Sequence, residues 1–202
     1  TFTFNGGVTE NTSGTVTVDG AITSSNDAIV FGAITLGDSV TINTNATNGT
    51  GDITIGAVTG NNHNLTLTTE NNISNADVTA SGAISGVTQL TLADIGGTAT
   101  LSGDVDVTTL TVGNTVLNVA FTGNGSSVAN TFTPNNDGTF IFGASGGTQT
   151  YNGGLNTASV DGTVTLNGTI ASSDDAIVLG AVTLGSATTV DTNSTTTNRA
   201  DI

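Results

Sequence analysis

Two stretches of this 202-residue sequence, ITSSNDAIVFGAITLG at 22–37 and IASSDDAIVLGAVTLG at 170–185, match at 12 of 16 positions. The match continues outward, because TFTFNGGV at 1–8 resembles TQTYNGGL at 148–155, one residue short of the 148-residue offset between the longer stretches. Self-similarity over a long, fixed period is the sequence signature of a repeat architecture. The sequence therefore predicts a fold built by stacking similar units.

The offset between the matching stretches sets the expected domain organisation. We expect residues 1–147 to form one full long repeat and residues 148–202 to begin the next copy, continuous with the first in a single elongated rod. The chain has no methionine and opens inside the strand-like TFTF. We therefore expect it to be an interior piece of a longer chain.

Shorter phrases inside the long repeat indicate the size of one turn. Gly-Ala followed by Ile or Val starts at Gly20, Gly32, Gly56 and Gly82, so the second and third gaps are each about twice the first. Short runs of alternating apolar and polar residues accompany these phrases, and such runs are typical of strands. In TVTV at 15–18 the valines point inward and the threonines outward. The pattern predicts an all-β fold, an elongated parallel β-helix (β-solenoid) with turns of roughly 20–26 residues and a rod about 45 Å long.

Two other structures remain open at this point. Asp19-Gly20 and Asn167-Gly168 stand between alternating runs, which is a strong hairpin signal and favours tandem antiparallel β-sandwich repeats. Few aromatic residues and a high net charge favour disorder, although the regular apolar alternation argues for burial.

Composition narrows the function. The hydrophobic fraction is 35% with seven Phe, one Tyr and no Trp, so we expect a thin, aliphatic core. The absence of Cys excludes disulfides, thiolate metal sites and a cysteine nucleophile. A net charge of -15 with a single cationic side chain, Arg199, argues against nucleic acid and anionic membrane surfaces as partners. No apolar run is long enough for membrane insertion as a helix.

Residues suited to catalysis are few. His63, the only histidine, lies in the polar segment 61–64, and we interpret it as a solvated turn residue. Asp104 with Asp106, or Asp174 with Asp175, could form a carboxylate pair of the kind that glycosidases use. Asp174 aligns with an asparagine in the other copy, however, and exchange of this kind is typical of turns. We therefore expect no enzyme, no catalytic residue and no organic cofactor.

Calcium is the one cofactor that the sequence leaves open. Acidic residues beside Gly or Asn in expected turns could contribute carboxylate and carbonyl ligands. Neither the EF-hand spacing nor the Gly-rich calcium nonapeptide occurs. The weak candidates for calcium ligands are Asp27, Asp38, Asp52, Asp104, Asp106 and Asp175.

Two further surface features suggest binding functions. Thr-x-Thr triplets would suit ice binding if they stacked on one flat face, but their spacing follows no single turn length. Residues 122–138 contain the only proline, Pro134, and we expect them to leave the rod as a loop.

The sequence GTVTVDGAITSSNDAIVFGAITLG at 14–37 resembles the Gly-, Thr-, Asn- and Val-rich repeats of filamentous-haemagglutinin-like and autotransporter-passenger surface proteins of bacteria. The resemblance lies in repeat pattern and composition and covers the whole chain. It implies a right-handed parallel β-helix, an extracellular or cell-surface location, and a structural or adhesive role in attachment, aggregation or biofilm. The long repeat of this chain exceeds the repeats usual in those families, which leaves a self-assembling filament or sheath subunit as the alternative. Expected partners are neighbouring copies of the repeat or of the protein, and host or matrix glycans.

Overall fold

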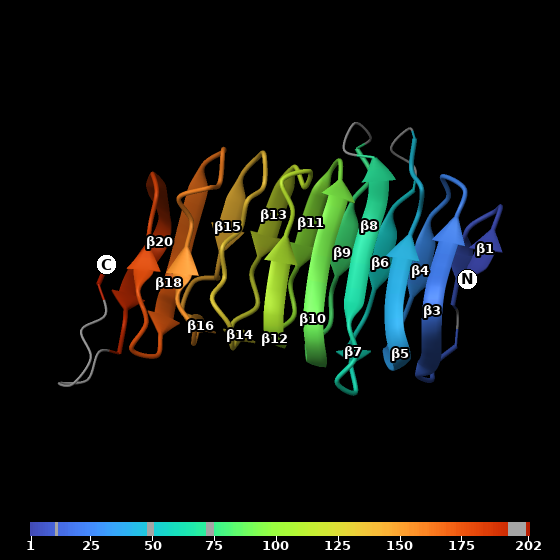
Figure 1. Ribbon diagram of the computed structural model, residues 1–202, viewed down its shortest axis with the longest axis horizontal. Coiled ribbons are helices and arrows are strands. Elements are labelled where there is room, and N and C mark those ends of the chain that lie inside the picture. Colours follow the sequence, from blue (N-terminus) through green and yellow to red (C-terminus); the bar gives the residue numbers. More distant parts are fainter. Residues whose placement is uncertain (11, 48–50, 72–74, 194–200) are drawn as a thin grey trace.

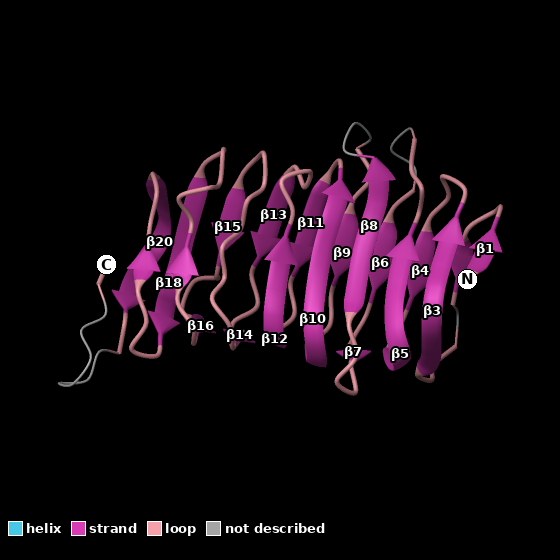
Figure 2. Ribbon diagram, in the orientation of Figure 1, coloured by secondary structure: helices cyan, strands magenta, loops and turns pink. Residues whose placement is uncertain are grey.

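Alternating apolar and polar residues place this chain in short strands, and each strand pairs with the strand one turn further along. The computed structural model describes residues 1–10, 12–47, 51–71, 75–193 and 201–202. Within these residues the fold is all-β, and the strands stack in parallel as a β-solenoid of about nine turns (Figure 1, Figure 2). The predicted fold class is confirmed.

The rod contains strands of two to 12 residues joined by short corners. They are β1 (Phe2–Phe4), β2 (Val8–Thr9), β3 (Val16–Ser24), β4 (Ile29–Phe31), β5 (Ile34–Asn43), β6 (Ile53–Ile55), β7 (Val58–Thr59), β8 (Leu65–Asn71), β9 (Val78–Ala80), β10 (Ile84–Ile95), β11 (Thr98–Leu101), β12 (Val105–Val112), β13 (Asn118–Phe121), β14 (Ser127–Val128), β15 (Phe140–Phe142), β16 (Thr148–Tyr151), β17 (Leu155–Asn156), β18 (Val164–Ser172), β19 (Ile177–Val178) and β20 (Val182–Asp191).

Three ladders of paired positions run along the rod, and the chain visits them in the order 1, 2, 3 in each turn. Ladder 1 contains Phe2, Ile22, Ile42, Leu67, Leu92 and Val112, and in its later part Phe132, Leu155 and Ile177. Ladder 2 contains Val8, Ile29, Ile53, Val78, Ala99, Val119, Phe140, Val164 and Val182. Ladder 3 contains Thr17, Thr35, Thr59, Ser85, Asp106, Ser127, Thr150, Ala171 and Asp191.

The winding is right-handed. In Figure 1 the chain advances from the N-terminus on the right to the C-terminus on the left. The nearer strands β3, β5 and β8 run upward, and the fainter, more distant β13 and β15 run downward. The number of residues in each step along ladder 2 is close to the predicted turn length. The shortest step joins Val164 and Val182, and the longest joins Ile53 and Val78.

The long repeat does not contain a whole number of turns. Thr17 and Thr165 are equivalent in sequence, yet Thr17 lies on ladder 3 and Thr165 pairs with Ile141 on the strands of ladder 2. Six steps along ladder 3 lead from Thr17 to Thr150, and the chain then passes ladder 1 before it reaches ladder 2 at Thr165. Each passage from one ladder to the next is one third of a turn, so one long repeat contains six turns and two thirds of another. The second copy is therefore rotated by one third of a turn relative to the first.

The core is aliphatic over most of the rod but aromatic in its later turns. Ile, Val and Leu side chains on the inward positions are buried along β3 to β12, as the alternation predicts. The expectation of a wholly aliphatic core is wrong for a cluster in which the Phe132 and Tyr151 rings stack with centroids 5.8 Å apart. This buried cluster consists of Phe121, Phe132, Phe140, Phe142 and Tyr151.

The Asp-Gly and Asn-Gly pairs form corners of parallel turns, so the hairpin alternative is wrong. Gly20 lies inside β3 at a φ of 69°, and Gly168 lies inside β18 at a φ of 67°. The strand register shifts at both positions. These are the left-handed conformations that glycine adopts readily, used here to turn a strand from one ladder to the next. Every strand pairing within the described ranges is parallel.

Candidate functional site

A turn that projects from the rod forms one end of a surface groove. Asn61 and Asn62 adopt left-handed conformations, with φ of 49° and 64°, and the His63 N–H donates to the Gly60 carbonyl at 2.8 Å. Asparagine tolerates this conformation better than other non-glycine residues. The turn of the solenoid that contains this segment is longer along ladder 3 than the turn before it and the turn after it, which provides the chain for the projection.

Beside this projection the next turn of the solenoid carries a bulge. Gly86 has a φ of 67°, and the register between β10 and β12 shifts between Ser85 and Val87. A bulge adds one residue to a strand and changes the direction of the neighbouring side chains. The projecting turn and the bulged strand together leave a hollow on the rod surface.

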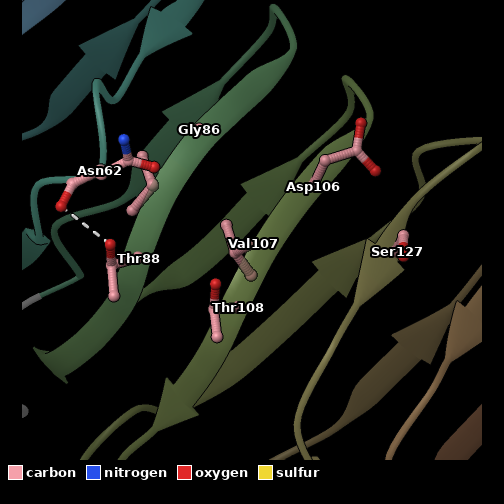
Figure 3. A pocket seen from close by; sticks show the side chains of 8 residues that line it. Asn62, Gly86, Thr88, Asp106, Val107, Thr108 and Ser127 are labelled. Atoms are coloured by element: carbon pink, nitrogen blue, oxygen red, sulfur yellow. Dashed lines mark hydrogen bonds between the residues drawn. The ribbon is translucent and has the colours of Figure 1, made fainter.

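The hollow is an open groove of about 400 Å³ (Figure 3). Val87 and Val107 form its apolar lining. Its polar lining comes from four consecutive turns of the solenoid, so the groove runs along the rod rather than around it. The polar residues are Asn62, Thr88, Asp106, Thr108 and Ser127.

Hydrogen bonds fix two of the groove's hydroxyl groups. The Thr88 hydroxyl donates to the Asn62 carbonyl at 2.8 Å, the dashed line in Figure 3, so its oxygen remains an acceptor. The Asn152 side-chain amide donates to Oγ of Ser127 at 3.1 Å, so the Ser127 hydroxyl can still donate. The groove therefore presents both donors and acceptors.

Asp106 is the only charged residue among those that line the groove. Partial desolvation raises the pKa of its carboxyl group, and the nearby Asp104 raises it further, while a hydrogen bond from the Ser127 N–H acts in the opposite direction. The groove thus contains one carboxylate whose negative charge is poorly compensated by the protein.

Asp106 also interrupts a row of hydroxyl groups that follows ladder 3. Thr and Ser occupy the outward positions for four turns before Asp106 and for two turns after it. Neighbouring members of the row belong to adjacent strands, which are about 4.8 Å apart. The groove is therefore part of a longer polar strip parallel to the rod axis.

The candidate calcium ligands do not form a common site in the described ranges, where no cluster of three or more His, Asp or Glu residues could hold a metal ion. Oδ1 of Asp104 accepts the Gly125 N–H at 2.7 Å. Asp38 has its Oδ1 3.9 Å from Nδ1 of His63. Asp27 and Asp175 lie at equivalent corners, where their backbone carbonyls accept the hydroxyls of Ser24 and Ser172.

Asp and Asn side chains instead join successive turns of the solenoid. Oδ1 of Asp52 accepts the Asp77 N–H at 2.9 Å, and Oδ1 of Asp77 accepts the Thr98 N–H at 2.7 Å. One turn further on, Oδ1 of Asn118 accepts the Thr139 N–H at 3.0 Å. These side-chain oxygens satisfy backbone donors that the strand ladder leaves unpaired.

Among the described residues considered for catalysis, Asp104 and Asp106 are close enough for the charge of Asp104 to raise the pKa of Asp106. His63 is one-third exposed in its turn, as expected. Asn26 and Asp174 have nearly equal φ values, 66° and 65°, which confirms that their exchange reflects turn conformation. Arg199 lies outside the described residues.

The Thr-x-Thr triplets are distributed over all three ladders. Thr66 and Thr111 share ladder 1, where Thr41, Thr66, Thr91 and Thr111 stack in register. Thr100 belongs to the strands of ladder 2, and Thr150 belongs to ladder 3. The triplets therefore do not form one flat array, as their spacing predicts.

The prediction of an outward loop at residues 122–138 is wrong. The segment contains β14 and completes a turn of the solenoid, and Phe132 within it is fully buried in the aromatic cluster. Asn136 is also buried, and its side-chain amide donates to the carbonyls of Gly138 and Thr139 at 3.0 and 3.1 Å. Pro134 is itself buried, in the irregular segment between the isolated bridge at Phe132 and β15, so the chain stays within the rod.

Comparisons with protein-family models, with curated proteins and with solved structures find no match. Among the described residues no helix could span a membrane. Sequence reasoning identified Asp106 but not Asn62, Thr88, Thr108 or Ser127. The doubled left-handed asparagines and Gly86 were the available signals, since both mark departures from regular strand structure.

Proposed function

We propose that this chain is a structural and adhesive segment of a secreted or surface-exposed bacterial repeat protein, and that it acts as a stalk or adhesin rod in attachment, aggregation or biofilm formation. Matrix or host glycans and neighbouring copies of the repeat are its proposed partners. The proposal places the protein outside the cell or on the cell surface, where its activity is binding and not catalysis.

The observation that carries the proposal is the uninterrupted stacking of turns. Ladder 2 continues through nine positions and passes from one sequence repeat into the next without a break. Each turn is stabilised by its neighbours, so length adds reach without a new core. The outer surface is polar and acidic, with a net charge of -15 for the whole chain, which keeps such a rod soluble.

Adhesion can be tested with beads that carry the purified chain at equal densities and orientations. We expect the coated beads to attach to extracellular matrix or biofilm material more strongly than beads coated with an unrelated acidic β-solenoid of similar length. Attachment equal to that of the control beads would contradict the adhesive part of the proposal.

A second candidate is self-assembly into a filament or sheath. Successive turns of the rod are joined by parallel strand pairing, as in the pairing of Phe140 in β15 with Val164 in β18. Rods stacked end to end could pair with one another in the same way.

Sedimentation velocity over a range of protein concentrations tests this candidate. Self-assembly predicts a concentration-dependent series of longer species. A single monomeric species at all concentrations would exclude unaided polymerisation.

A further inference from the structure

We propose that the groove at Asp106 binds the end of an extended neutral glycan that lies along the polar strip of ladder 3. This inference rests on the adhesive function proposed above and assigns one of its binding sites. The structural basis is the coincidence of a groove, a row of hydroxyl groups and one carboxylate at the same place on the rod.

The chemistry of the lining matches a polyhydroxylated ligand. Sugar hydroxyls both donate and accept, and the groove offers a donor at Ser127, an acceptor at Thr88 and an amide with both functions at Asn62. Asp106 can accept two hydroxyl hydrogens from adjacent carbons of one sugar ring. Hydrogen bonds to a carboxylate are stronger than those between neutral groups, so Asp106 would contribute most to affinity.

Charge selects a neutral glycan over a sulfated or uronic one. The sequence has no lysine, and its one arginine lies outside the described residues. No residue lining the groove is cationic. An anionic sugar would meet the Asp106 carboxylate and the field of a chain with net charge -15, and nothing in the groove would compensate for this repulsion.

The shape of the surface sets the direction of the ligand. The projecting turn at Asn62 closes one end of the groove, whereas the polar strip continues beyond Ser127 to Thr150. Successive positions on the strip are about 4.8 Å apart, which is similar to the length of one hexose in an extended chain. The last sugar would therefore lie against Asn62, and the preceding sugars would follow the strip toward the C-terminal end of the rod.

Nuclear magnetic resonance titration of the whole chain with cellotetraose, maltotetraose and a heparin tetrasaccharide tests the assignment. We expect at least one neutral tetrasaccharide to shift the amide signals of Thr88, Asp106, Thr108 and Ser127, and the heparin tetrasaccharide to leave them unchanged. Asp106→Asn should weaken binding about tenfold, because a carboxylate acceptor becomes a neutral one. Asp137→Asn is the matched control, since Asp137 is exposed and does not line the groove.

Three results would overturn the site: no binding of either neutral tetrasaccharide, binding that shifts signals elsewhere on the rod, or equal affinity in the Asp106→Asn variant. The bead assay separates this outcome from failure of the proposed function. Beads carrying Asp106→Asn that attach as well as the unmodified chain would leave the adhesive rod intact and remove only this site. Tetrasaccharide binding without bead attachment would support the site and contradict the adhesive role.

Discussion

The Tyr151 hydroxyl donates a hydrogen bond to Oε1 of Gln149 at 2.9 Å inside the core of the rod. Nε2 of Gln149 in turn donates to the carbonyls of Phe121 and Gly123, at 2.9 and 3.1 Å. Both side chains are buried. The two residues replace Phe2 and Phe4 of the first copy, so a hydrogen-bonded pair in one copy takes the place of two phenylalanines in the other.

Burial of Tyr151 predicts an unusual alkaline titration. Desolvation raises the pKa of Tyr151 well above its ordinary value, so the folded state favours the neutral phenol and loses stability as the pH rises through the folded-state pKa. Tyr151 is the only tyrosine, so phenolate absorbance reports this residue alone. We expect phenolate to appear only as the chain unfolds, together with the loss of the strand signal in circular dichroism. Phenolate formation in the folded state near pH ~10, the ordinary value for tyrosine, would show that the ring reaches solvent.

Two corner glycines offer a matched pair of stability measurements. Gly20→Ala should cost about 1–2 kcal/mol, because its φ of 69° is left-handed but no atom lies within 4 Å of the added Cβ. Gly168→Ala should cost more, because its Cβ would also lie 2.5 Å from the carbonyl oxygens of Ala144 and Gly147. Urea denaturation of both variants measures the difference. Equal losses would mean that the crowded corner relaxes around the methyl group.

Asp77 connects three turns of the solenoid, because its backbone N–H donates to Asp52 and its carboxylate accepts the Thr98 N–H. Asp77→Ala removes the acceptor for the Thr98 N–H and should lower the free energy of unfolding by about 1 kcal/mol. Asp77→Asn keeps an oxygen at the same position and should retain much of that stability. Denaturation of the two variants at neutral pH compares them directly. An Asn variant as unstable as the Ala variant would indicate that the negative charge, and not the acceptor oxygen, is what matters.

Asp106 predicts a pH-dependent gain in stability on mutation. The pKa of Asp106 is raised in the folded state, so its carboxyl group ionises less readily there than in the unfolded chain. At low pH the group is neutral in both states and costs no stability. As the pH rises above the ordinary value of about 4 the group ionises, and the free energy of unfolding falls. Asp106→Asn should therefore raise the Tm at neutral pH, and the gain should disappear in acid. Melting curves from acid to neutral pH measure the effect. A Tm gain that is independent of pH would assign it to packing.

Calcium should have little effect on the rod. The candidate Asp104 already uses Oδ1 as the acceptor for a backbone N–H, and Asp27 and Asp175 lie at separate corners about one long repeat apart. We expect chelator treatment followed by calcium addition to leave the Tm unchanged and to produce no calorimetric binding heat. A rise in Tm on adding calcium would contradict this expectation.

The sequence was sufficient to predict parallel turns of about the observed length, because the alternation of apolar and polar residues indicates strands and the Gly-Ala phrases indicate corners. The predictions were wrong where one short sequence pattern is compatible with two different structures. Asp19-Gly20 supplies a left-handed glycine, which both a hairpin and a corner between parallel strands require. Pro134 indicated an exposed loop, but Phe132 two residues earlier is buried: it pairs with Leu155 of the next turn, and its ring packs against Phe140, Phe142 and Tyr151.

The groove was only partly predictable for a related reason. Asp106 stands out in the sequence as an acidic residue, whereas Thr88, Thr108 and Ser127 resemble many other hydroxyl residues in the chain. Their common position depends on the exact lengths of the intervening turns and on a one-residue register shift at Gly86. Turn lengths vary by several residues along this rod, so spacing alone cannot identify the residues that share a surface.

A repeat of 6⅔ turns also gives any longer rod of this type a screw symmetry. Three consecutive copies would complete a whole number of turns, 20, before a given side chain faced its original direction. At about 4.8 Å per turn this distance is roughly 96 Å. A surface feature shared by all copies would then point in three directions in succession. Such a rod could meet a partner from any side without first turning about its own axis.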